Sequence, residues 1–187
     1  MAERKVKAVV TRKREFRAFA ELSYAHWVIL ENAKTEREGW LYECLTANIL
    51  AAFKIEAYLN HIGPLLFQDW KERRSWRSKL KRVLEHLGIT PDADERFRTL
   101  EDVFQIRNQV AHGRTKTLSE EAEETGEMEE LRRRKPQEFW EERSTLEFAE
   151  QAYEHTESIF RQLHARAGRD DAELRRSGHS YSIKLTG

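Results

Sequence analysis

The feature that most constrains the fold is the segment 36–62, in which apolar side chains recur every three or four residues. This spacing places them along one face of an α-helix. Apolar residues also occupy other faces of the same segment, at Ile49, Leu50 and Phe53. We therefore expect a central helix that is buried on most sides and that ends at Gly63-Pro64. The main apolar face comprises Trp40, Cys44, Ala47, Ala51, Ile55, Tyr58, Leu59 and Ile62.

The same spacing predicts helices over residues 12–31, 70–87 and 138–167, and one more that opens at Thr90-Pro91 and runs to Gly113. Only 8 glycines and 3 prolines occur among 187 residues, too few for the many turns of a β-sandwich or barrel. Five Trp, nine Phe and five Tyr can fill a sizeable core. The expected fold class is all-α, a helical bundle of about five helices.

Charge is unevenly spread along the chain. Residues 1–82 hold 17 basic and 10 acidic side chains, whereas the remainder holds 16 and 23. Such asymmetry suits either a surface for a polyanion or two halves that pair with each other. Within residues 115–137, seven acids occupy positions 120–130 and a basic run follows. We expect a solvated loop or a helical excursion there; the alternative is an acidic segment that covers a basic groove.

We expect one helical domain over residues 12–167, preceded by a basic arm (1–11) and followed by a polar, loosely attached tail (168–187). Cys44 is the single cysteine, which excludes an internal disulfide framework and zinc sites built on cysteine pairs. The histidines fall at no metal-binding spacing and no glycine-rich phosphate loop occurs, so we expect neither a metal nor a cofactor. The sequence has no apolar run long enough for a membrane span or a signal peptide, and a cytoplasmic protein is expected.

Residues 105–114, QIRNQVAHGR, carry the clearest chemical signal. On a helical wheel Arg107 falls in the middle of an apolar arc, where an unpaired charge would be costly. Arg107 should therefore face a groove, a partner subunit or a carboxylate such as Glu56 on the central helix. Asn108 and His112 are four residues apart and share an adjacent helix face. As an alternative, His112 simply interacts favourably with the dipole at the helix end.

The segment Arg107 to Gly113 resembles the R-x4-6-H signature of HEPN domains (higher eukaryotes and prokaryotes nucleotide-binding). In that signature an arginine is followed by a polar residue, often asparagine, then by small or apolar positions and a histidine. The setting agrees, because the segment ends a helix of an all-α chain in which a long buried helix comes first. The resemblance extends over residues 12–167, and its specific part is this short segment.

The resemblance implies a metal-independent endoribonuclease that acts as a homodimer, with the motifs of both chains forming one composite site. The RNA 2′-OH attacks the adjacent phosphate and leaves a 2′,3′-cyclic phosphate and a 5′-OH. Arg107 and His112 would be catalytic and Asn108 supporting, since arginine stabilises charge at phosphorus and histidine exchanges protons near neutral pH. The implied setting is a toxin–antitoxin, antiviral defence or stress system, with an antitoxin or regulatory protein as partner.

One position departs from a HEPN subfamily. Some HEPN toxins are modified by a nucleotidyltransferase that is their partner. Those toxins often carry the modified tyrosine two residues after the motif histidine, whereas this chain has Arg114. We therefore do not expect control through such a tyrosine. Two functions without catalysis also stay open: a helical module for dimerisation, nucleotide binding or protein interaction, and an RNA-binding adaptor.

A second candidate surface is the basic segment 70–82, where seven bases alternate with Trp70 and Trp76. Basic side chains contact phosphates and exposed aromatic rings stack on bases, so the segment is a candidate RNA surface. The alternative is a solvated helix face with both tryptophans in the core. The candidate RNA-binding residues are Arg73, Arg74, Arg77, Lys79, Lys81 and Arg114.

Overall fold

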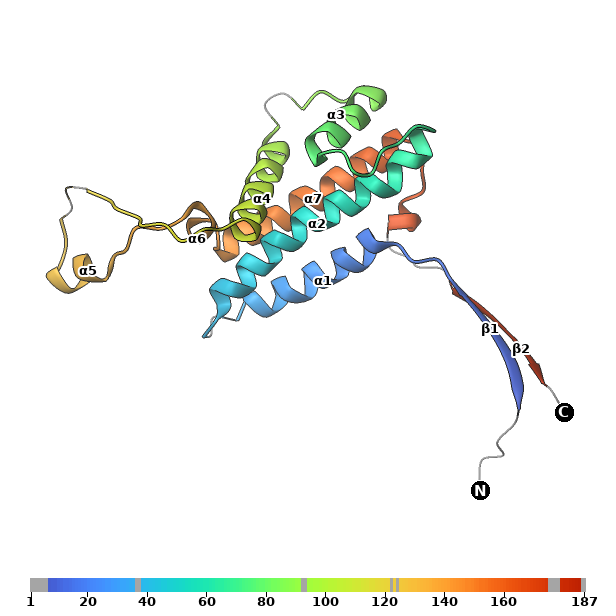
Figure 1. The fold of residues 1–187 in the computed structure, drawn as a ribbon, viewed down its shortest axis with the longest axis horizontal. Coiled ribbons are helices and arrows are strands. Elements are labelled where there is room, and N and C mark those ends of the chain that lie inside the picture. Colours follow the sequence, from blue (N-terminus) through green and yellow to red (C-terminus); the bar gives the residue numbers. More distant parts are fainter. Residues whose placement is uncertain are drawn as a thin grey trace, which may run out of the picture.

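The computed structural model describes residues 7–35, 38–91, 94–121, 123, 125–174 and 179–185. These residues form a helical bundle with seven α-helices, one 3-10 turn and one pair of strands. Figure 1 shows two extensions that leave the bundle on opposite sides, one carrying α5 and the other formed by β1 and β2. The expected helical bundle is confirmed, and the pair of strands is an addition that the sequence patterns do not predict.

The centre of the bundle is α2 (Trp40–Leu66), which packs against α1 (Ala18–Ala33), α3 (Trp76–Leu87), α4 (Glu95–Ala111) and α7 (Leu146–Arg166). This arrangement confirms that the apolar residues of the long segment surround a central helix. Every residue of the predicted apolar face except Trp40 is buried, namely Cys44, Ala47, Ala51, Ile55, Tyr58, Leu59 and Ile62.

The prediction that Gly63-Pro64 ends the central helix is wrong. The helix continues to Leu66, and the Phe67 N–H still donates to the Gly63 carbonyl at 2.8 Å. Glycine is needed at position 63 for space: a Cβ there would lie 2.1 Å from Cε2 of Trp70, whose ring rests against the helix. Gly63 therefore permits a close aromatic contact and does not cap the helix.

Three predicted helix starts are also corrected. The helix expected over residues 70–87 begins at Trp76, after Ser75, whose hydroxyl accepts the Ser78 N–H at 3.3 Å. The first helix begins at Ala18, because residues 8–14 form a strand. The fourth begins after Asp94, whose side chain accepts the Arg96 N–H at 3.0 Å; Thr90-Pro91 is not the cap, and residues 92–93 lie outside the described part of the chain. An aspartate satisfies the exposed N–H groups of a first turn as well as threonine does.

The predicted last helix is two helices, α6 (Phe139–Glu142) and α7. Thr145 starts α7 anew, since its hydroxyl accepts the Phe148 N–H at 3.2 Å. Before it, the Ser144 hydroxyl donates to the Trp140 carbonyl at 2.6 Å and closes α6. A Ser-Thr pair inside an otherwise continuous apolar pattern is a capping signal, and it divides the helix here.

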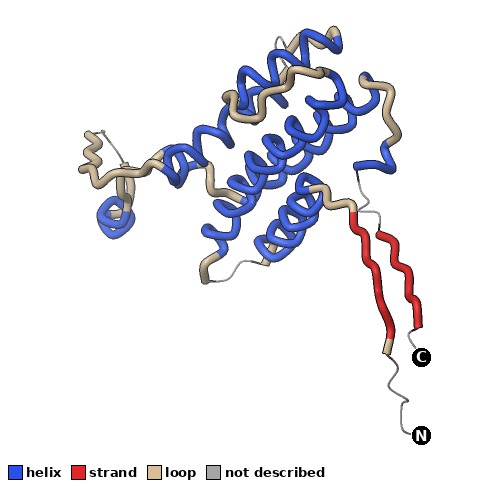
Figure 2. Tube along the Cα trace, turned by 45° about the vertical axis from the view of Figure 1, so that its right-hand side comes forward, coloured by secondary structure: helices blue, strands red, loops and turns tan. Residues whose placement is uncertain are grey.

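The two ends of the described chain pair with each other. Strand β1 (Ala8–Arg14) runs antiparallel to β2 (His179–Leu185), and Figure 2 shows the two strands leaving the bundle together. We call this pair the terminal ribbon. The expectation of a separate arm and a loosely attached tail is therefore corrected for these two stretches. A short 3-10 turn, η1 (Asp171–Leu174), precedes β2.

The charged segment 115–137 extends from the bundle as predicted. Its described residues are loop apart from one helix of six residues, α5 (Met128–Arg133). Ion pairs also join the basic and acidic halves of the chain, at Lys34–Glu150 (3.8 Å) and Lys54–Glu157 (3.1 Å). Part of the charge asymmetry is thus explained by pairing within one molecule. Within the described ranges no helix combines the length and apolar character that a membrane crossing requires.

Candidate functional site

The arginine–histidine motif lies at the C-terminal end of α4. Ala111 is the last helical residue, and the His112 N–H donates to the Asn108 carbonyl at 3.0 Å, so His112 caps the helix. The His112 side chain is exposed to solvent. A histidine in this position can exchange protons with a bound molecule and is not held by the core. We refer to Arg107, Asn108 and His112 as the motif site.

Arg107 is anchored by two polar contacts. Its Nη2 donates to Glu56 Oε2 at 3.0 Å, and its Nη1 donates to Asn108 Oδ1 at 2.7 Å. The side chain is 25% exposed, and its guanidinium carbon lies about 6 Å from the rings of Phe53 and Phe104. Pairing with Glu56, one of the arrangements expected for an arginine in an apolar arc, is confirmed.

Glu56 serves two cations at once. Its Oε1 accepts from Lys79 Nζ at 3.3 Å, on the opposite side of the carboxylate from the Arg107 contact. Lys79 is only 1% exposed and also donates to Asn60 Oδ1 at 3.0 Å and to the Glu72 carbonyl at 3.2 Å. Lys79 is therefore a buried link between α3 and α2, and its prediction as an RNA contact is wrong.

The remaining basic residues of α3 and the segment before it stay at the surface. Arg73 and Arg74 are exposed; Arg77 pairs with Glu101, and Lys81 lies 3.8 Å from Glu85. Their role as RNA contacts stays a prediction.

The two tryptophans of the basic segment do not form an exposed stacking surface. Trp76 is buried, with its ring stacked on Phe104 at 3.9 Å between centroids. Trp70 is half-buried and stacks on Phe67 at 5.8 Å. The interpretation that these rings belong to the core is confirmed for Trp76, and little aromatic surface is left there for bases to stack on.

A hollow of about 350 Å³ opens beside the motif site. Its lining combines His112 with the cations Arg114 and Lys116, and an ion pair at 2.7 Å between Lys116 and Glu138 borders it. One buried polar atom of its lining, Gln109 Oε1, has no hydrogen-bond partner within the described structure. Arg107, whose buried Nε also has no partner there, does not line the hollow. A bound molecule with a donor would satisfy the Gln109 oxygen. The lining residues are Gln109, His112, Gly113, Arg114, Lys116, Glu138 and Trp140.

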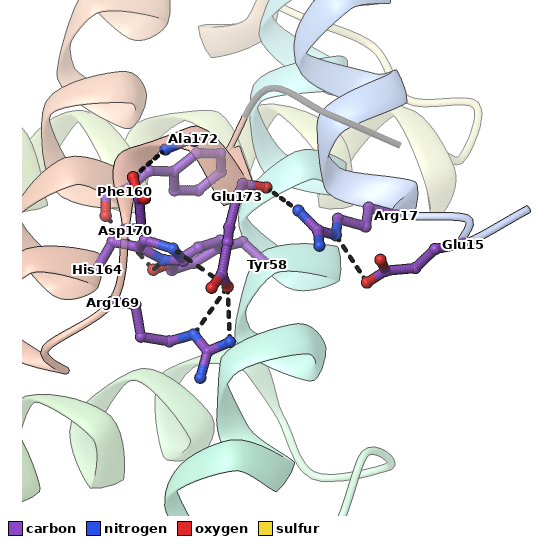
Figure 3. Close-up of polar contacts among 9 residues, drawn as sticks. All are labelled: Glu15, Arg17, Tyr58, Phe160, His164, Arg169, Asp170, Ala172 and Glu173. Atoms are coloured by element: carbon purple, nitrogen blue, oxygen red, sulfur yellow. Dashed lines mark hydrogen bonds and ion pairs between the residues drawn. The ribbon is translucent and has the colours of Figure 1, made fainter. Parts of the chain in front are cut away.

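The structure also joins polar residues that the sequence patterns do not connect (Figure 3). The Tyr58 hydroxyl lies 3.1 Å from His164 Nδ1, and His164 Nε2 lies 3.8 Å from Glu173, which Arg169 contacts at 2.6 Å. We call these four residues the His164 cluster. His164 lies on α7, Glu173 on η1 and Arg169 in the loop between them, whereas Tyr58 comes from α2, far away in the sequence.

The centre of the His164 cluster is buried, whereas the side chains of Arg169 and Glu173 are 32% and 29% exposed. Tyr58 and His164 are fully buried, and burial raises the pKa of the Tyr58 hydroxyl and lowers the pKa of His164. Arg17 donates to the Glu173 carbonyl at 2.5 Å and so connects η1 to the start of α1. The cluster fastens η1 onto the bundle, and its histidine ring is not accessible to a substrate.

Two further buried polar groups lie between α1, α2 and α7. Lys54 pairs with Glu157, and burial lowers its pKa to about 8. Burial, followed by the nearby Lys54 charge, lowers the pKa of His26 well below its usual value. Neither ring nitrogen of His26 has a hydrogen-bond partner among the described residues. Both groups are enclosed in the core, so they act on stability.

Metal binding finds no support in the described ranges, where three or more His, Cys, Asp or Glu side chains nowhere form a group suited to an ion. The motif site is therefore the arrangement with the most accessible chemistry: an exposed histidine, an anchored arginine and a cationic hollow. No family model matches the chain, and no curated protein or solved structure is significantly similar to it.

Proposed function

We propose that this chain is a metal-independent endoribonuclease of the HEPN type, acting as a homodimer, with Arg107 and His112 as catalytic residues and Asn108 in support. One observation carries the proposal: His112 is exposed at the end of α4 and borders a hollow whose other cations are Arg114 and Lys116. This combination offers a proton-exchanging group next to a place where a phosphate can bind.

The dimer is supported by apolar side chains around Arg107. Phe53 on α2 and Val110 on α4 are each 43% exposed, and the Phe53 ring lies 6.0 Å from the Arg107 guanidinium carbon. A second copy packed on this face would bury both and bring two motif sites together. Burying apolar area of this kind is the main driving force of homodimer formation.

In the proposed reaction the ribose 2′-oxygen attacks the adjacent phosphorus, and the bond from phosphorus to the 5′-oxygen breaks. His112 residues of the two chains take the proton from the 2′-OH and deliver one to the departing 5′-oxygen. Arg107 stabilises the negative charge on the non-bridging phosphate oxygens. Glu56 keeps the guanidinium oriented while Nη1, which contacts Asn108 in the structure, turns to the phosphate. The products are a 2′,3′-cyclic phosphate and a 5′-OH.

A second candidate is a helical module without catalysis. It is favoured by the contacts of Arg107, because an arginine that already holds Glu56 and Asn108 can serve the fold alone. The setting in a toxin–antitoxin, defence or stress system, with an antitoxin or regulator as partner, rests on family analogy for either candidate.

The test is RNA cleavage in EDTA by the wild-type protein and by His112→Ala. We expect the wild type to leave 2′,3′-cyclic phosphate ends and His112→Ala to lose about 10²- to 10⁴-fold in rate, as expected for the loss of an acid–base group. Arg161→Ala, on the exposed face of α7, is the matched control and should cleave normally. Equal activity of the wild type and His112→Ala would favour the module without catalysis.

The dimer is tested separately by light scattering. Val110→Glu places a charge on the proposed interface and should yield a monomer that is folded and inactive. The control is Leu118→Glu, in the exposed loop that follows α4, which should leave the dimer intact. A wild-type monomer that cleaves RNA would overturn the composite site.

A further inference from the structure

The terminal ribbon projects from the bundle, and in the described structure no other element pairs with its strands (Figures 1 and 2). A two-stranded ribbon is marginally stable by itself, so one that is kept outside the core calls for a partner. Val9, Tyr181 and Ile183 all expose more than half of their surface. The question is which kind of partner these strands fit.

The ribbon has only positive charges. Residues 7–14 and 179–185 contain no aspartate or glutamate. Arg14 pairs with Glu21 at the start of α1. The cations farther out have no acidic partner within the part of the chain that the structure describes. Two identical ribbons would repel each other, which disfavours a second copy and favours a polyanion. The cations are Lys7, Arg12, Lys13, Arg14 and Lys184.

The strand register combines aromatic and basic side chains on one face. Residues directly opposite each other share a face, so Arg12 lies beside Tyr181 and Val10 beside Ile183. A hollow of about 430 Å³ opens on the ribbon and is lined by these four residues together with Lys13, Arg14 and Ser180. Tyr181 is 70% exposed, so its ring is available for stacking.

We propose that the terminal ribbon binds single-stranded RNA, with a base stacked on Tyr181 and the backbone phosphates held by Arg12 on the same face and by Lys13, the next residue of the strand, which also lines the hollow. An exposed ring with flanking cations is the arrangement by which proteins hold single strands without regard to sequence. The proposal deepens the ribonuclease function and rests on it for the identity of the polymer, because it gives the substrate a contact away from the motif site.

Binding is measured by fluorescence anisotropy with a labelled oligouridine of about 12 nucleotides. Every protein is full-length and carries His112→Ala so that the RNA stays intact. Tyr181→Ala should weaken binding about tenfold through loss of stacking, whereas Tyr181→Phe keeps a ring and should bind as before. Arg12→Gln with Lys13→Gln should lower the slope of log Kd against log salt by about 1.4, or about 0.7 per cation on a single strand.

The matched charge control is Arg161→Gln with Arg166→Gln, which removes the same charge from the exposed face of α7. If this control weakens binding as much as the ribbon pair does, only net charge matters and the proposal is wrong. Binding of polyglutamate as tight as that of RNA, with no dependence on Tyr181, would assign the ribbon to an acidic protein and also overturn it. Since cleavage is not measured here, failure of the ribonuclease proposal leaves this result interpretable.

Discussion

His112 and His164 each lie at the C-terminal end of a helix with an arginine nearby, and they differ in burial and in polar contacts. His112 lies exposed at a helix end beside a hollow, and its neighbour Arg107 is held by Glu56. His164 is fully buried and bonded to Tyr58, with Glu173 and Arg169 on its far side (Figure 3). The His164 cluster has the better-formed chain of polar contacts, yet only His112 can meet a substrate.

This difference teaches that a chain of hydrogen bonds does not identify a reactive site. Burial gives the His164 cluster its order and lowers the pKa of His164, and the same burial keeps substrates out. The motif site has fewer contacts and more open space. The following predictions concern the free energy of unfolding, in which the two sites should behave oppositely.

The largest effect is expected from His164→Ala. It removes a buried ring and the partner of the Tyr58 hydroxyl, so the free energy of unfolding should fall by about 3 kcal/mol. Urea denaturation measures this change, and RNA cleavage below the melting temperature should be unchanged. Full stability combined with lost cleavage would reverse the roles that we assign to the two histidines.

Acid pH should destabilise the protein through its buried histidines. Burial lowers the folded-state pKa of His26, His61 and His164. Below about pH 6.5 the unfolded chain therefore binds more protons than the folded one, and stability falls as the pH drops. Urea titrations at about pH 7.5 and 5.5 check this. His164→Ala should reduce this acid dependence, and a stability that does not change with pH would contradict the prediction.

A smaller effect is expected from Glu56→Gln. The buried Lys79 keeps Asn60 and the Glu72 carbonyl but loses its contact with the Glu56 carboxylate, at a cost of about 1 to 2 kcal/mol. Cleavage should also fall, because Arg107 loses the charged one of its two anchoring contacts. Glu101→Gln, which breaks an exposed pair with Arg77, is the control and should cost less than about 0.5 kcal/mol. Equal losses for the two variants would show that the Glu56 contacts have no special role.

The smallest effect on stability is expected from His112→Ala. An exposed side chain at a helix end contributes little, and the free energy of unfolding should change by no more than about 0.5 kcal/mol. Thermal denaturation beside the cleavage assay measures both properties on one sample. A loss above about 2 kcal/mol would mean that His112 serves the fold.

Helical spacing predicts the core of this protein well, because burial of one face repeats along the whole of α2 and α7. Helix ends are predicted less well. Gly63 resembles a helix-ending glycine in the sequence, but it packs against Trp70, and no local sequence pattern indicates that contact. The terminal ribbon was missed for the same reason: its strands are short, and each finds its partner at the other end of the chain.

The motif site and its surroundings were also predicted only in part. The wheel position of Arg107 predicts a carboxylate, a groove or a partner subunit opposite it, and the contact with Glu56 shows the first of these within one chain. The prediction from the basic segment 70–82 is wrong at Lys79, because sequence alone does not distinguish a solvated lysine from one that links two helices. The His164 cluster has no sequence signal at all, since its members come together only when η1 docks against the bundle.

The terminal ribbon also has a consequence for folding. In an ordinary β-hairpin the connection is a short turn, whereas here it is the entire bundle, and Arg14 pairs with His179 across it. The entropy cost of closing so long a loop is met only after the helices have brought α1 and η1 together. The strands therefore form last and separate first, and protection of the amides in β1 from hydrogen exchange reports that the bundle is complete.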